Sequence, residues 1–190
     1  MCTKEHLTLE GLKNIGRSRP IKSSINLGLP EDLVNTFSII PVEKPIIINQ
    51  QIKDPYWLTG FVCGDGCFMV SISKSKSTKT GYAVRLSFSI SQHKQDTLLM
   101  KYLANYLSCG NWYEKTGKSY GEFIVSKFSD IVSKIIPLFD KYPMYGDKSK
   151  DFYSFKAVSK IGRSLLNKGH LTTSGIEEIG KIKKNMNKGR

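Results

Sequence analysis

The sequence predicts a single mixed α+β module with the element order αββαββα and further helices at its C-terminal end. Two observations predict this class. In residues 68–72 and 84–90 apolar and polar side chains alternate, as in half-buried strands, and several longer segments repeat apolar residues at helical spacing. The chain has 190 residues, which fits one compact module with an appended arm better than two full domains. We therefore expect an antiparallel sheet with helices over one face and a polar, open second face.

The first helix of this module is predicted from its boundaries. Asp54 is a suitable N-cap, Pro55 is a suitable first helical residue, and the apolar segment 56–62 follows them. The helix ends at Asp65, where we expect Gly66 to supply a permissive backbone for the turn into the first strand. In the two strands that follow, the side chains expected to face the core are those of Phe68, Val70, Ile72, Val84, Leu86, Phe88 and Ile90.

The remaining elements follow from the same patterns. A turn-like, cationic loop at 74–81 joins the two strands, and a helix is predicted at 94–107. Two short strands near 111–115 and 120–126 precede a helix at 129–139. A last pair of helices is predicted from about 149 to 167 and from 172 to 187.

An internal repeat indicates how the chain is divided. Segment 6–16 matches segment 170–180, with His, Leu, Thr, Gly, Ile and Gly in register. Because a repeated tail indicates a repeated module, we interpret residues 1–28 as the tail helix of a preceding repeat. Residues 29–53, which contain three prolines, are then an extended connector, and residues 54–190 are the complete module. The alternative is that the two segments are unrelated amphipathic helices with a threonine cap.

Charge is the strongest signal in the composition. The 29 Lys and Arg residues outnumber the 16 Asp and Glu residues, which gives a net charge of +13, and the excess grows toward the C-terminus. Such a surplus favours a polyanionic partner, either nucleic acid or an acidic membrane surface. No apolar stretch approaches the roughly 18 to 20 residues that span a bilayer, so we expect no membrane-embedded segment.

The segment 57–68 carries the most chemical information. Gly60 and Gly64 lie four residues apart on an otherwise apolar helix, which allows a second helix to approach closely. Asp65 follows at the helix C-terminus, where the helix dipole is already negative, so we expect a cation to compensate it. Two such helix ends brought together would hold a divalent metal ion. The alternative for Asp65 is a purely structural C-cap.

This segment, Trp-Leu-Thr-Gly-Phe-Val-Cys-Gly-Asp-Gly-Cys-Phe, resembles the motif of the LAGLIDADG homing endonuclease family. The likeness extends to the element order, to segments 90–93 and 146–152, and to the His-Leu-Thr before the terminal helix, as in the fungal mitochondrial intron-encoded branch. It implies the family's fold, in which two such helices pack at a pseudo-twofold axis beside a saddle-like antiparallel sheet. The residues then expected at the helix interface are Leu58, Gly60, Phe61 and Gly64.

The resemblance also implies roles for the residues that match the family's active site. Asp65, with the carbonyl of Gly64, is expected to bind Mg²⁺ or Mn²⁺. Gln92 matches a polar residue that orients water, and Lys148 matches a lysine near the cleaved phosphate; the alternatives are an ordinary strand-end glutamine and a surface lysine. Cys63 departs from the family pattern, which usually has an acid two residues before the metal ligand. We expect it to change the fine tuning of the site more than its existence.

The open face of the sheet is expected to enter the major groove of DNA, which admits a two-stranded ribbon and distinguishes every base pair. The alternative is a solvated polar face. The candidate contacts are Ser71, Ser73, Ser75, Arg85, Ser87, Ser89 and Ser91, with Lys74, Lys76 and Lys79 in the loop for phosphates or bases.

The function that these expectations favour is that of a site-specific double-strand DNA homing endonuclease module, which hydrolyses phosphodiester bonds with a divalent metal. Its partners would be double-stranded DNA and a second LAGLIDADG module, either an N-terminal half or a second copy in a homodimer. The resemblance places it in the mitochondrion. Two alternatives remain: an intron RNA maturase or other nucleic-acid-binding module without cleavage activity, and an inactive half that needs a partner in trans.

Overall fold

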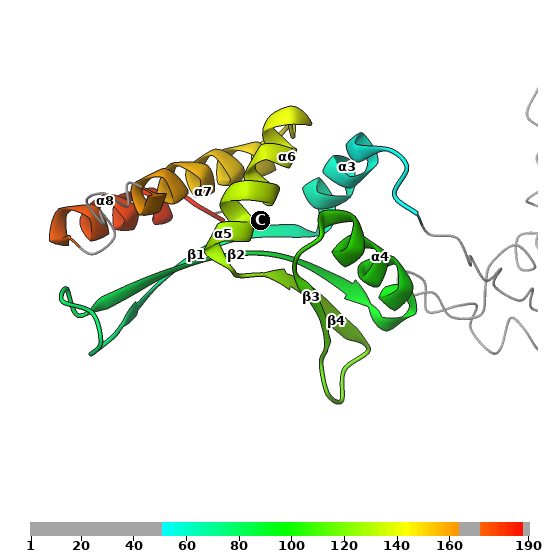
Figure 1. The fold of residues 1–190 in the computed structure, drawn as a ribbon, viewed down its shortest axis with the longest axis horizontal. Helices are drawn as coiled ribbons and strands as arrows, with labels where there is room; N and C mark the ends of the chain where they lie inside the picture. Colours follow the sequence, from blue (N-terminus) through cyan, green and yellow to red (C-terminus); the bar gives the residue numbers. More distant parts are fainter. Residues whose placement is uncertain (1–50, 164–171, 188–190) are drawn as a thin grey trace, which may run out of the picture. The chain divides into compact units, whose positions relative to one another are not determined.

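A computed structural model describes residues 51–163 and 172–187, and Figure 1 shows how their helices and strands are arranged. The predicted tail helix 1–28 and nearly all of the connector 29–53 lie outside the described residues. Within them, the predicted mixed α+β fold and its element order are confirmed. Among the described residues, no helix combines the length and apolarity needed to cross a membrane.

Helix α3 (Pro55–Asp65) begins and ends where the sequence predicts. The Asp54 carboxylate accepts a hydrogen bond from the N–H of Tyr56 at 2.8 Å, and Pro55 takes the first helical position. Gly66 was expected to supply an unusually permissive backbone, and this expectation is wrong. Its φ of −80° and ψ of 153° are extended values that any residue adopts. Glycine is needed there because a Cβ atom would lie 2.6 Å from both Cγ1 and the carbonyl oxygen of Val62. The chain can therefore pass from helix into strand without a loop.

The sheet has four antiparallel strands in the order β1-β2-β4-β3. They are β1 (Gly66–Lys74), β2 (Tyr82–His93), β3 (Asn111–Glu114) and β4 (Tyr120–Val125). Strand β1 extends to Lys74, so the connecting loop is one residue shorter than expected. Within this loop the Thr78 hydroxyl donates to the Ser75 and Tyr82 carbonyls at 3.2 and 2.9 Å.

The two faces of the sheet are chemically distinct. Phe68 pairs with Phe88 and Val70 with Leu86, and these side chains are buried, whereas Ser71 pairs with Arg85 on the other face. In Figure 1 helices α6 and α7 lie above the sheet, and the lower face is open. The predicted separation into a helix-covered apolar face and an open polar face is confirmed.

Helix α4 covers the end of the sheet formed by β3 and β4. The predicted helix 94–107 starts with a 3₁₀ turn, η2 (Lys94–Asp96), and continues as α4 (Thr97–Leu107). Met100, Leu103 and Leu107 are buried in the common core. Ser108 ends the helix with φ 51°, and its N–H donates to the carbonyls of the last turn.

The predicted helix 129–139 contains an irregularity. It consists of α5 (Phe128–Asp130), a π-helical turn η3 (Ile131–Ile135) and α6 (Ile136–Lys141). Pro137 provides the reason, because proline has no N–H and its ring clashes with the carbonyl four residues earlier in a regular α-helix. The wider π turn, in which the Ile136 N–H donates to the Ile131 carbonyl, precedes this proline.

Two helices complete the described structure. Helix α7 (Asp147–Arg163) begins two residues before the predicted start, and α8 (Thr173–Lys183) follows the residues that lie outside the description. The Thr172 hydroxyl oxygen accepts a hydrogen bond from the Gly175 N–H at 3.1 Å, so Thr172 is the N-cap of α8.

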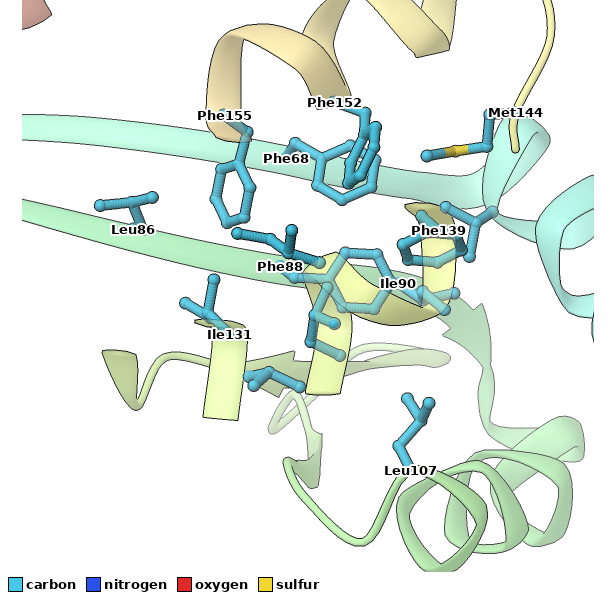
Figure 2. Close-up of a cluster of buried hydrophobic side chains, with 14 of the residues drawn as sticks. Phe68, Leu86, Phe88, Ile90, Leu107, Ile131, Phe139, Met144, Phe152 and Phe155 are labelled. Carbon is cyan, nitrogen blue, oxygen red and sulfur yellow. The ribbon is translucent and has the colours of Figure 1, made fainter. Parts of the chain in front are cut away.

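An aromatic core joins the sheet to helices α6 and α7 (Figure 2). The ring of Phe68 is fully buried at its centre. Its centroid lies 5.2 Å from that of Phe88, 5.8 Å from Phe139, 5.5 Å from Phe152 and 5.3 Å from Phe155. This packing attaches α7 firmly to β1, the strand that directly follows the acidic end of α3.

Candidate functional site

The exposed C-terminal end of α3 brings three of the predicted site residues together. Gln92 Nε2, near the end of β2, donates to Asp65 Oδ2 at 2.6 Å. Lys148, in the first turn of α7, donates from Nζ to the Gly66 carbonyl at 2.5 Å. The three side chains come from α3, β2 and α7. Asp65 is the last residue of α3, Gln92 is bonded to Asp65, and Lys148 is bonded to Gly66, the first residue of β1.

Lys148 brings a cation to the backbone at this helix end, and its compensation of the Asp65 charge stays a prediction. Carbonyl groups in the last turn of a helix have no N–H partner within the helix and carry partial negative charge. The Lys148 ammonium is half-buried and bonds to the carbonyl of the C-cap residue Gly66, which follows Asp65 in the chain. An ammonium has three N–H donors, so one bond to the backbone leaves donors for an anionic ligand.

The donor atoms at this helix end fit a hard divalent cation. Asp65 contributes carboxylate oxygens, and Gly64 lies in the last turn, where a carbonyl oxygen is available. Among residues 51–163 and 172–187, no three His, Cys, Asp or Glu side chains are grouped so that they could hold a metal by themselves. Mg²⁺ usually retains waters and binds one or two carboxylates together with substrate phosphates, so one acid from this helix is a suitable share of such a site.

Cys63 is turned toward the segment between α6 and α7. Its half-buried thiol lies 3.9 Å from the Tyr145 carbonyl oxygen, to which it is placed to donate. The residue that departs from the family pattern thus contacts backbone rather than Asp65. The effect of Cys63 on the site remains a prediction.

Hydrogen bonds around the buried carboxylate of Asp151 support this end of the molecule. The carboxylate of Asp151, one turn after Lys148 on α7, is 2% exposed, and its Oδ1 accepts from the Asn187 N–H at 3.0 Å. The side chain of Asn187 in turn donates to the Phe68 carbonyl on β1 at 3.1 Å. These bonds tie the turn after α8 to α7 and β1. The sequence did not indicate them, because the three residues are far apart along the chain.

The exposed face of α3 differs in part from the predicted helix interface. Leu58 is 1% exposed and belongs to the core of this module, so the expectation that it lies on the exposed face is wrong. Gly60 and Gly64 are exposed, and a Cβ atom built on either meets nothing within 4 Å. Phe61 is half-buried and stacks on Trp57, with ring centroids 5.2 Å apart. Trp57 is 46% exposed and replaces Leu58 on this face.

The open face of the sheet carries most of the predicted DNA contacts. Strand alternation and register place on it Ser71, Ser73, Arg85, Ser87, Ser89 and Ser91. In the β1–β2 loop, Lys76 and Lys79 are exposed, and the hydroxyl of Ser75 bonds with that of Ser77 at 2.9 Å. Lys74 is not a loop residue: it ends β1 and alternates to the side of Val70 and Ile72. It is therefore the one candidate among these whose register puts it on the helix-covered side.

The second hairpin extends the open face with residues that sequence analysis missed. Tyr113 is 52% and Tyr120 40% exposed, and Glu122 pairs in register with both Ser91 and Tyr113. Lys115 Nζ lies 2.8 Å from Glu122 Oε2, and this hydrogen bond raises the pKa of the Lys115 ammonium. Alternation within residues 120–125 was a usable signal for the orientation of these side chains. Only the strand order shows that they adjoin β2.

Comparisons with known proteins identify the family. A model of the LAGLIDADG endonuclease family matches residues 58–159, and the chain therefore belongs to this family. Probable intron-encoded endonuclease 3 of Neurospora crassa is 39% identical over 93% of this chain and 32% of its own length. Probable intron-encoded endonuclease 2 of the same fungus is 35% identical over 98% of this chain and 41% of its own length. The chain thus spans well under half the length of these curated relatives.

A solved structure shows the same fold. The I-SmaMI LAGLIDADG homing endonuclease bound to cleaved DNA is 42% identical and superposes with a TM-score of 0.86, covering 98% of this chain and 61% of that one. I-SmaMI has also been solved on uncleaved DNA in the presence of calcium ions. The predicted family and fold are confirmed.

Proposed function

We propose that this chain is a module of a site-specific, divalent-metal-dependent DNA homing endonuclease. The observation that carries the proposal is the convergence of Asp65, Gln92 and Lys148 at the exposed end of α3. The relatives described as intron-encoded endonucleases and the I-SmaMI complex with cleaved DNA support it.

Each residue of the site has a distinct role in phosphodiester hydrolysis. Asp65, with the Gly64 carbonyl, would hold Mg²⁺, or Mn²⁺ in its place. Such an ion would polarise the scissile phosphate and would lower the pKa of the attacking water. Gln92 fixes the Asp65 carboxylate through its N–H donor, and its amide oxygen can accept a hydrogen bond from the water. Lys148 has further N–H donors that could bond to the phosphate, where positive charge would stabilise the transition state.

The open face of the sheet is the proposed DNA-binding surface. Ser71 and Arg85 are cross-strand neighbours on it, so a hydroxyl and a guanidinium lie side by side in a ribbon of a size that the major groove admits. Lys76 and Lys79 extend from the tip of this ribbon and suit phosphate contacts, which contribute affinity without sequence information.

A second LAGLIDADG module is the proposed protein partner, because one helix end supplies a single carboxylate. The exposed glycines of α3 and the stacked pair of Trp57 and Phe61 form a face on which a second helix can pack closely. The partner is an N-terminal half or a second copy of this chain. We assign the protein to the mitochondrion, in line with the resemblance to the mitochondrial branch and with the relatives described as intron-encoded.

The test starts with DNA selection by the 190-residue chain. Duplexes would be selected from a randomised library in Ca²⁺ and then incubated with the protein in Mg²⁺. Cutting by the chain alone supports a homodimer, and cutting only after a second LAGLIDADG module is added supports a two-module enzyme. Intact DNA under both conditions overturns the nuclease proposal, and tight binding of intron RNA in that case identifies the maturase alternative.

A further inference from the structure

A carboxylate lies on the face of the sheet that we propose binds DNA. Among the described strand residues whose side chains alternate to this face, Glu122 on β4 is the one acid. Its cross-strand neighbours are Ser91 on β2 and Tyr113 on β3, so it occupies the interior of the face rather than its edge. In a chain with a net charge of +13, an acid at this position opposes the approach of a polyanion.

The surroundings of Glu122 reduce this repulsion without removing the acceptor. Lys115 Nζ contacts Oε2 at 2.8 Å, and the Glu122 side chain is 29% exposed. A carboxylate has two oxygens and about four lone-pair sites, so one bond to Lys115 leaves acceptor capacity. The pair presents to the groove a hydrogen-bond acceptor whose charge is balanced locally.

The major-groove edges of the bases determine what such an acceptor can recognise. Cytosine presents an amino donor alone, adenine presents an amino donor beside the N7 acceptor, and guanine and thymine present acceptors at the corresponding positions. A carboxylate therefore favours cytosine, is less compatible with adenine, and is repelled by guanine and thymine. Because Glu122 has no hydrogen of its own to donate when ionised, it discriminates by repulsion as well as by attraction.

We propose that Glu122 is a specificity-determining residue that reads a cytosine in the DNA target, with Lys115 as its positioning partner. This inference rests on the proposed function and deepens it by assigning a base to one side chain. The sheet register also gives the position of that base. Ser91, the neighbour of Glu122, precedes Gln92 of the acidic site, so the cytosine lies at the end of the recognised segment nearest the cut.

The same register relates this position to that of Arg85. Ser91 and Arg85 lie on one strand and one face, and the strand between them is about 20 Å long, or about six base-pair steps of 3.4 Å. The cytosine is therefore expected about six base pairs closer to the cut than the base pair affected by Arg85→Ala.

The experiment compares the selected DNA sequences of three proteins: wild type, Glu122→Gln and Glu114→Gln. Glutamine keeps the size of the side chain and an oxygen for Lys115, but its amide matches the N6 and N7 groups of adenine. Glu114 is the matched control, because it lies in the same hairpin and contacts a lysine, Lys94, at 3.6 Å, yet alternates to the helix-covered side. The folding of each variant is checked by its thermal unfolding.

The expected result is a cytosine preference of at least about fivefold at one position in wild type and Glu114→Gln, replaced by adenine at that position alone in Glu122→Gln. An unchanged base preference in Glu122→Gln overturns the inference while leaving the proposed function intact. A preference changed equally at all positions overturns it as well, because that indicates a structural role. If wild type selects no sequence, the proposed function fails, and this inference fails with it.

Discussion

Asp65→Asn separates the catalytic contribution of Asp65 from its structural contribution. The substitution removes a negative charge from the negative end of the α3 dipole, a placement that costs about 0.3–1 kcal/mol. It also weakens the 2.6 Å hydrogen bond from Gln92 by about 1 kcal/mol, because the acceptor is no longer charged. The two effects have opposite signs. The free energy of unfolding should therefore change by less than about 1 kcal/mol, and Tm by less than about 4 °C.

The rate of DNA cleavage should respond very differently. Loss of the carboxylate removes the one acidic side chain of helix α3, and we expect cleavage of the selected duplex to fall at least about 100-fold. The control is Asp54→Ala at the other end of the same helix. This variant loses the N-cap hydrogen bond that the Asp54 carboxylate accepts from the Tyr56 N–H. It should lower the free energy of unfolding by about 1 kcal/mol and leave cleavage unchanged below Tm.

The assay pairs Mg²⁺-dependent cleavage, followed on gels, with thermal unfolding of the same preparations. Cleavage by Asp65→Asn within about threefold of wild type would refute the assignment of Asp65 as metal ligand. A larger drop in Tm for Asp65→Asn than for Asp54→Ala would also refute this assignment, because the Asp65 carboxylate would then have a mainly structural function.

Three further outcomes are expected. In urea titrations, Lys148→Met should lower the free energy of unfolding by about 1–3 kcal/mol, because it loses the bond to Gly66. The control Lys150→Met removes an exposed ion pair with Asp147 and should change the free energy of unfolding by less than about 0.5 kcal/mol. Equal losses in the two variants would contradict this prediction. Phe68→Ala should cost about 3–5 kcal/mol by the same measurement, and a cost below about 1 kcal/mol would argue against the aromatic core. Burial raises the pKa of the Cys109 thiol, so its alkylation at pH 8, followed by peptide mass mapping, should be slower in the folded than in the unfolded chain, and equal rates would contradict its burial.

The strands were predictable because their side chains repeat with a short period. Phe68, Phe88 and Ile90 were assigned to the core from alternation alone, and the structure buries all three. Helix α3 was predictable from Asp54 and Pro55, since capping depends on residues next to one another in the chain. The π turn before Pro137 was missed because helical periodicity is nearly the same across a single wide turn.

Errors arose where packing between elements decides the outcome. Leu58 was expected on the exposed side of α3, but small rotations of a short apolar helix decide which apolar residues face the core, and the sequence offered no polar stripe to fix that rotation. Gly66 was expected to need unusual backbone angles, whereas its requirement comes from the close approach of Val62.

Local order in the chain, namely the alternation, the caps and the acidic end of a glycine-containing helix, was enough to determine the fold class, the family resemblance and the candidate acid Asp65. The resemblance implied that Gln92 and Lys148 belong to the same site. Only the tertiary structure gave their contacts, from Gln92 to Asp65 and from Lys148 to the Gly66 carbonyl, and the position of Glu122 beside the strand that carries Gln92. The physical reason is that local patterns record the periodicity and caps of single elements. Contacts between residues 27 or 82 positions apart depend on strand order and on the aromatic core that holds α7 against β1.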